Sequence, residues 1–155
     1  MNVIRQKDYT RTNLILELVN FFERNTIDYM LGCGTACKFL EDGDIYKPLD
    51  KDHDIDFHVW EGQQSLFLLK AKELENSGFE IKDYGYKVQL SKPNLKIMIE
   101  ILFLFREDGN IYFRTTDPAN NGKRSCVANC FERQSLMISN KSVDVVSQKY
   151  CECLY

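Results

Sequence analysis

The stretch DKDHDIDFHV, residues 50–59, places four aspartates at alternate positions and then continues into apolar residues. Carboxylates this close repel one another, so a fold retains such a cluster where a positive charge compensates it. From residue 53 onward the stretch alternates as a strand does, with polar side chains on one face and apolar side chains on the other. The polar face carries Asp54, Asp56 and His58, and the apolar face carries Ile55, Phe57 and Val59. A metal ion beside the aspartates is the compensation that we expect.

The geometry of this strand favours one kind of metal. Asp54 and Asp56 lie two residues apart, so their carboxylates project from the same face about 6 to 7 Å apart. Mg²⁺ takes hard oxygen ligands and keeps coordination positions for substrate phosphates. Such ions activate an attacking oxygen and stabilise a leaving one. The strand therefore predicts Mg²⁺ (or Mn²⁺) bound by Asp54 and Asp56, and catalysis of phosphoryl or nucleotidyl transfer.

A third acid is expected from a second strand. Glu100 is the sole charged residue between Lys96 and Arg106 in an apolar run. An ionised carboxylate is seldom buried in such a run without a partner or a metal. If the two strands pair, Glu100 faces the gap between Asp54 and Asp56 as a third catalytic and metal-binding acid. The alternative is an edge-strand carboxylate that points to solvent.

The upstream LGCGTA, residues 31–36, predicts a phosphate site. A glycine followed by a hydroxyl residue at a helix N-terminus presents free N–H groups and the positive end of the helix dipole. We expect Gly34 and Thr35 to bind nucleotide phosphates, with Lys38 adding positive charge.

Other interpretations of the acidic stretch stay open. A run of charges can simply be a solvated loop. Asp50, Asp52 and the later acids also follow the spacing of an EF-hand calcium loop, but Ile55 stands where that loop needs glycine. His53 and His58 flank the acids, and we expect both to form hydrogen bonds at the surface.

Composition limits the class of protein. The chain has 155 residues, 44% hydrophobic and 28% charged, which suits one globular domain over 1–155. A net charge of -3 and a pI near 5.4 argue against a general nucleic-acid or anionic-membrane binder. The N-terminus lacks the apolar segment of a signal peptide, and no run is long enough to span a bilayer. We expect a cytoplasmic protein.

Cysteines make up a further set of residues with potential chemistry. In the expected compartment reduced thiols are the default. Two pairs have C-x3-C spacing, but the residues between them do not resemble zinc knuckles, so buried thiols are favoured over zinc. The six are Cys33, Cys37, Cys126, Cys130, Cys151 and Cys153.

Hydrophobic periodicity and turn signals predict an α/β (α+β) domain with a central sheet. The chain alternates helix, strand, helix, strand and helix before several strands. The expected elements are helices at 12–24, 36–41 and 61–78, strands at 27–34, 53–60, 86–91, 95–105 and 111–116, a loop at 117–124, and a short strand pair or loop followed by a helix at 136–155.

Three stretches, taken in their order along the chain, resemble the nucleotidyltransferase-fold superfamily. They are YMLGCGT (29–35), KPLDKDHDIDFHV (47–59) and IMIEILFL (97–104). Within it the chain is most similar to the LicD/fukutin-like family, which carries a Gly-Thr motif, a proline-containing loop and an Asp-x-Asp strand. The closing Leu154–Tyr155 also resembles that family's C-terminus. The resemblance implies a mixed central β-sheet flanked by helices.

The resemblance also implies a function. Asp54 and Asp56 would be metal-binding catalytic acids, Gly34 and Thr35 phosphate contacts, and Glu100 the third acid. The donor would be a nucleotide such as CTP, ATP or a CDP-linked compound. The group transferred would be a nucleoside monophosphate, phosphocholine or an alditol phosphate, and the acceptor a hydroxyl, for example on a glycan. The alternative is a catalytically inactive copy of the fold with a binding or regulatory role, because the second glycine of the family's Gly-Thr motif is absent.

Overall fold

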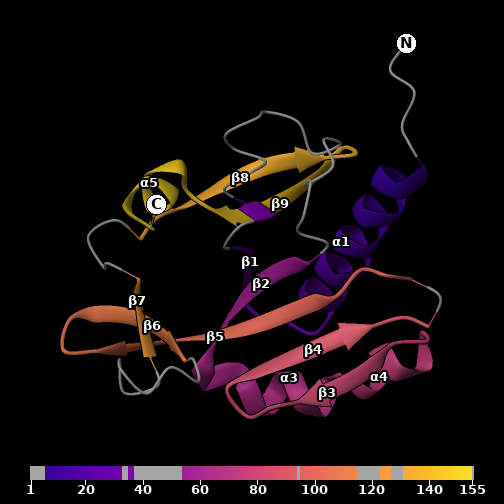
Figure 1. The fold of residues 1–155 in the computed structure, drawn as a ribbon, viewed down its shortest axis with the longest axis horizontal. Coiled ribbons are helices and arrows are strands. Elements are labelled where there is room, and N and C mark those ends of the chain that lie inside the picture. Colours follow the sequence, from indigo (N-terminus) through magenta and orange to yellow (C-terminus); the bar gives the residue numbers. More distant parts are fainter. Residues whose placement is uncertain are drawn as a thin grey trace.

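The computed structural model describes residues 6–32, 35–36, 54–93, 95–114, 123–126 and 131–154. The helical elements are α1 (Gln6–Arg24), the short 3-10 helix η1 (Glu61–Gln63), α3 (Gln64–Lys70), α4 (Lys72–Asn76) and α5 (Gln148–Leu154) (Figure 1). The strands are β1 (Tyr29–Leu31), β2 (Ile55–Trp60), β3 (Glu80–Asp83), β4 (Lys87–Ser91), β5 (Ile99–Glu107), β6 (Asn110–Arg114), β7 (Lys123–Cys126), β8 (Arg133–Ile138) and β9 (Lys141–Val146).

Within the described residues the strands form one mixed sheet in the order β3-β4-β5-β2-β1-β9-β8, and β6 continues from β5 to β7. The central strand β2 pairs in parallel with β5 and antiparallel with β1. Strand β1 in turn pairs in parallel with β9. The expected mixed central sheet flanked by helices is confirmed.

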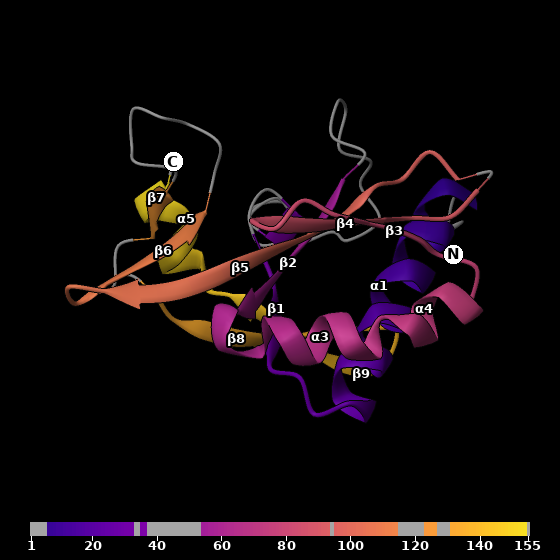
Figure 2. The same cartoon turned by 90° about the horizontal axis from the view of Figure 1, so that it is seen from below.

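Aromatic side chains join the sheet to the helices on its first face. The ring of Phe22 in α1 lies 5.3 Å from that of Phe57 in β2, and Phe67 in α3 lies 6.2 Å from Phe103 in β5. Figure 2 shows α3 and α4 along one side of β3, β4 and β5. Ile55, Phe57 and Val59 of β2 are fully buried in this core, as the alternation predicts.

The second face of β2 is buried as well, which the sequence did not predict. Asp56 is 8% exposed and His58 is fully buried. The His58 ring packs 5.9 Å from Phe113 of β6 and 6.5 Å from Tyr150 of α5. The expectation of a surface position for His58 is therefore wrong, because later elements cover this face of the strand. His53 lies outside the described residues.

Other differences from the expected elements have local causes. The first helix begins at Gln6, about two turns before the apolar periodicity starts at Leu14. The helix expected over 61–78 is interrupted at Ala71, between α3 and α4. Strand β3 was not expected, because it is largely exposed and lacks a clear apolar alternation. Strand β7 begins inside the expected loop at 117–124, at Lys123.

Several expectations concern residues outside the described part of the chain. They include the helix after Ala36 and the loop before Asp54, so the solvated-loop interpretation of Asp50 and Asp52 stays untested. In an EF-hand a helix follows the calcium loop, whereas here residues 55–60 form strand β2, which argues against the calcium-loop interpretation. The Asp-Gly hairpin is confirmed, with φ of 51° at Asp108 and 79° at Gly109.

Cys151 corrects the expectation for the cysteines. Its side chain is 8% exposed and takes part in a disulfide bond. The default of reduced thiols is therefore wrong at this position. None of the helices in the described residues combines the length and apolar character that a membrane-spanning helix requires.

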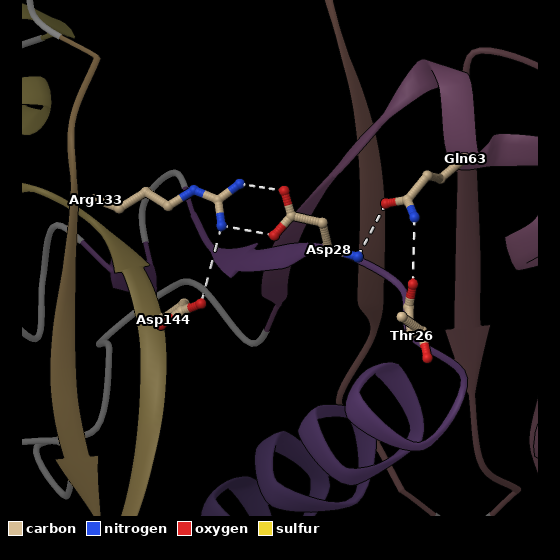
Figure 3. Close-up of polar contacts among 5 residues, drawn as sticks. All are labelled: Thr26, Asp28, Gln63, Arg133 and Asp144. Carbon is tan, nitrogen blue, oxygen red and sulfur yellow. Dashed lines mark hydrogen bonds and ion pairs between the residues drawn. The ribbon is translucent and has the colours of Figure 1, made fainter.

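A polar network fastens β8 and η1 to the turn before β1 (Figure 3). The Arg133 guanidinium donates two hydrogen bonds to the Asp28 carboxylate, and its Nη1 lies 3.9 Å from Asp144 Oδ2. The Asp28 N–H donates to Gln63 Oε1 at 2.9 Å, and Gln63 Nε2 donates to the Thr26 carbonyl at 3.3 Å. The hydrogen bonds from Arg133 hold the pKa of Asp28 below its ordinary value.

We predict that Arg133→Gln lowers the free energy of unfolding by about 1 kcal/mol at neutral pH, because two charge-assisted hydrogen bonds are lost from a partly exposed pair. The lowered pKa of Asp28 means that this contribution is present above the ordinary value of 3.8 and is lost as the pH falls through the folded-state value. The loss caused by Arg133→Gln should therefore shrink below about pH 4. Urea unfolding across a pH series measures both effects.

Lys149→Gln is the matched control, because Lys149 pairs with Glu132 at 3.1 Å and both side chains are more than half exposed. It should change the free energy of unfolding by less than about 0.5 kcal/mol. Equal effects of the two substitutions would contradict a special role for the Arg133 network.

Candidate functional site

The strand register brings two of the predicted acids side by side. Asp56 of β2 is paired directly with Glu100 of β5, and Glu100 is paired in turn with Gln89 of β4. Directly paired residues on neighbouring strands point to the same face of a sheet. The three side chains therefore form a row across β4, β5 and β2, and Asp54 lies one residue before β2.

Thr35 fastens the start of the acidic strand. Its Oγ1 donates to the Asp54 carbonyl at 3.2 Å and accepts from the Asp56 N–H at 3.1 Å. The Gly32 N–H also donates to the Asp56 carbonyl, at 2.9 Å. Thr35 is fully buried, so its hydroxyl positions the main chain on either side of Ile55. The sequence did not predict this role.

Two of the three predicted phosphate contacts cannot be placed. Gly34 and Lys38 lie outside the described residues, while Thr35 and Ala36 are the two described helical residues of that segment. Binding of phosphate by Gly34, Thr35 and Lys38 remains a prediction. The bonds of the Thr35 hydroxyl favour its main-chain N–H as the contacting group.

Glu100 is held by two donors. Lys87 Nζ donates to Glu100 Oε1 at 2.9 Å, and Gln89 Nε2 donates to the same oxygen at 3.0 Å. Burial lowers the pKa of Lys87, but the hydrogen bond and charge of Glu100 outweigh it and the net shift is upward. Because β5 lies between β4 and β2, the interpretation of Glu100 as a solvent-facing edge carboxylate is wrong.

The joint binding of a metal ion by Asp54, Asp56 and Glu100 remains a prediction. Asp54, Asp56 and Glu100 all belong to the described residues, and in that part of the chain no three His, Cys, Asp or Glu side chains gather closely enough to hold a metal ion. The two aspartates, with hard oxygen atoms at the start of one strand, have the donor type that Mg²⁺ prefers. Glu100 does not fit as a third ligand while Lys87 and Gln89 hold it.

Gly32 lies in contact with His58, which follows Asp56 on the same face of β2. A Cβ atom on Gly32 would meet His58 Cδ2 at 2.2 Å, which is closer than real Cβ contacts allow. Burial lowers the pKa of His58 to about 4, although a backbone hydrogen bond at Leu102 acts in the opposite direction. His58 is therefore neutral near pH 7, and its ring requires a glycine at position 32.

Lys87 and Gln89 are the site residues that sequence reasoning missed. The signal was the alternation of YKVQLS, residues 86–91, which places both side chains on one face of the expected strand. Which partner that face meets depends on the register between β4 and β5, and the sequence does not show it.

Together, the mixed sheet, its flanking helices and the paired acidic strands define a nucleotidyltransferase-like fold. A solved example is the crystal structure of the lincosamide antibiotic adenylyltransferase LnuA with lincomycin bound, with a TM-score of 0.59. It is 18% identical, and the match covers 99% of this chain and 87% of that chain. At this identity the likeness concerns the fold alone.

Sequence comparison adds no finer assignment. No protein-family model matches the chain, and no curated protein matches it. The structural likeness supports a nucleotidyltransferase-like fold. A particular closeness to the LicD/fukutin-like family gains no support.

We predict that Gly32→Ala destabilises the fold by about 1 to 3 kcal/mol, because the added methyl group forces His58 or β1 to move. Gly62→Ala is the control, since a Cβ there meets nothing within 4 Å. Chemical unfolding of Gly32→Ala, His58→Ala and the double variant tests the contact. The double variant should be more stable than the sum of the single losses implies, and strict additivity would contradict the steric explanation.

His58 also predicts a pH dependence of stability. Between about pH 6.5 and pH 4, the unfolded chain binds a proton at His58 that the folded protein excludes. The stability contribution is therefore present above pH 6.5 and is lost as the pH falls, by at most about 1.4 kcal/mol per pH unit. His58→Gln should flatten this slope in urea unfolding measured from pH 7 to pH 4.5. Equal slopes for the variant and the wild type would contradict the burial of a neutral imidazole.

Proposed function

We propose that this protein transfers a nucleoside monophosphate from a nucleoside triphosphate to an acceptor hydroxyl, in a Mg²⁺-dependent reaction. The observation that carries the proposal is the direct pairing of Asp56 with Glu100 on parallel strands of a nucleotidyltransferase-like fold. Asp54 and Asp56 would hold Mg²⁺ or Mn²⁺, and Glu100 would face the acceptor.

The reaction follows from the chemistry of the groups involved. The acceptor oxygen attacks the α-phosphorus in line, a new O–P bond forms, the bond between the α-phosphorus and the bridging oxygen breaks, and pyrophosphate leaves with its electron pair. The metal supplies charge stabilisation to the phosphate oxygens when it is bound. Glu100 accepts a hydrogen bond from the acceptor hydroxyl, orients it and takes its proton as the new O–P bond forms. Gly34, Thr35 and Lys38 would bind the phosphates that leave.

The identity of donor and acceptor belongs to the same proposal. The structural neighbour is an adenylyltransferase of lincosamide antibiotics, which supports ATP as the donor and a small hydroxyl-bearing molecule as the acceptor here. The LicD-like resemblance supports instead a CDP-linked donor and transfer of phosphocholine or an alditol phosphate to a glycan. A cytoplasmic location would supply nucleotide and Mg²⁺ in either case.

We predict that Mg²⁺ with ATP or CTP raises the melting temperature of the wild type. A ligand at about 100 times its Kd adds about 2.7 kcal/mol to the stability of a folded protein, which corresponds to roughly 5 to 10 °C for a chain of this size. Asp54→Asn and Asp56→Asn should each abolish the metal-dependent part of the shift. Differential scanning fluorimetry with each metal and nucleotide pair measures it.

Asp108→Asn is the matched control for these variants, because it removes an aspartate from the β5–β6 turn, where asparagine also tolerates a positive φ. It should respond to nucleotide as the wild type does. Pyrophosphate release with a panel of hydroxyl acceptors then separates the alternatives. Binding with no turnover on any acceptor supports a regulatory copy of the fold, and a wild type that responds to no metal and nucleotide pair contradicts the proposal.

A further inference from the structure

Lys87, Gln89 and Glu100 form a partly buried polar group that we call the Lys87 group. Both donors reach the same carboxylate oxygen, Oε1, at 2.9 and 3.0 Å. The side chains of Lys87 and Glu100 are 19% and 18% exposed, so water screens the pair only in part. Both donors lie on β4, so the two hydrogen bonds tie the Glu100 carboxylate to that strand.

The position of Lys87 is itself fixed by the β3–β4 hairpin. Its Nζ lies 5.8 Å from the ring centre of Tyr84 and 5.6 Å from that of Tyr86. The tip of the hairpin is held by two bonds to Gly85, since Gln64 Nε2 donates to its carbonyl and Asp83 Oδ1 accepts from its N–H, each at 2.8 Å. The ammonium group therefore has a defined place beside Glu100.

The charges in the Lys87 group determine whether Glu100 can bind a metal ion. Glu100 stands directly beside Asp56, where a third metal-binding acid is expected, but its negative charge already has a cation within hydrogen-bond distance. A divalent cation bound to Glu100 would lie close to the Lys87 ammonium group, whose Nζ is 2.9 Å from Glu100 Oε1. Two positive charges this close together repel by several kcal/mol at a partly buried site.

We propose that Lys87 supplies to Glu100 the positive charge that a metal ion would otherwise bring. Asp54 and Asp56 then are the metal-binding carboxylates, and Glu100 is reserved for the acceptor hydroxyl. The assignment of a metal to the two aspartates rests on the proposed function. The assignment of Lys87 as the cation that excludes metal from Glu100 rests on the contacts of the Lys87 group alone.

The chain contains a matched control pair. Lys92 Nζ lies 3.1 Å from Glu17 Oε2, and it also lies over an aromatic ring, that of Phe79, at 4.7 Å. Both pairs are partly buried, although the exposed fractions, 26% for Lys92 and 35% for Glu17, are higher than those of the Lys87 pair. Glu17 belongs to α1, whereas Glu100 lies in the acidic row.

The test is a titration with Mn²⁺ alone, followed by electron paramagnetic resonance of the free ion. Lys87→Met should bind Mn²⁺ on the order of tenfold more tightly than the wild type, because the released carboxylate becomes available as a ligand. Lys87→Arg, which keeps the charge, and Lys92→Met should bind as the wild type does. In a Glu100→Gln background, Lys87→Met should have no further effect.

If Lys87→Met does not fold, Lys87→Gln is the second variant, because it removes the charge but keeps a hydrogen-bond donor. A gain equal to that of Lys92→Met, or a gain that persists in the Glu100→Gln background, overturns the inference. The proposed function is tested separately, by measuring whether the wild type binds Mn²⁺ and whether Asp56→Asn abolishes that binding. A Glu100-dependent gain in Lys87→Met supports the inference whatever the wild type binds.

Discussion

The parallel pairing of β2 with β5 is the constraint on which the candidate site depends. On one face the pairing sets Phe57 against Ile101 in the buried core, and on the other it sets Asp56 against Glu100. Because side chains alternate along a strand, a slip of one residue would exchange the two faces. The packing of the core therefore also determines which acids meet, and the site needs no separate device to bring them together.

The start of β2 requires local support, because the strand brings polar groups into a buried position. Thr35 accepts one main-chain bond and donates another there, and Gly32 donates to the carbonyl of Asp56. These bonds satisfy main-chain groups that would otherwise be costly to bury. Gly32 and Thr35 thus hold the start of the acidic strand through main-chain hydrogen bonds.

The sequence predicted the acidic strand and the sheet because alternation and turn residues are local signals. Glu100 could be selected as a candidate site residue because a single charged residue in an apolar run is conspicuous. The sequence did not predict the burial of His58, which depends on rings from β6 and α5 far along the chain. Nor did it predict the contact of Lys87 with Glu100, since the register of two antiparallel strands is set by the whole sheet. The disulfide at Cys151 was missed because the expected compartment argued against it.

The chain itself compensates part of the negative charge at the candidate site. Lys87 reaches Glu100 from β4, so one of the three predicted site acids is compensated without any bound ion. The two aspartates at the start of β2 retain the hard oxygen atoms suited to a divalent cation. A carboxylate oxygen that already accepts hydrogen bonds from an ammonium and an amide group is less suited to bind a metal ion, and Glu100 owes this property to Lys87 and Gln89, which both lie on the neighbouring strand β4.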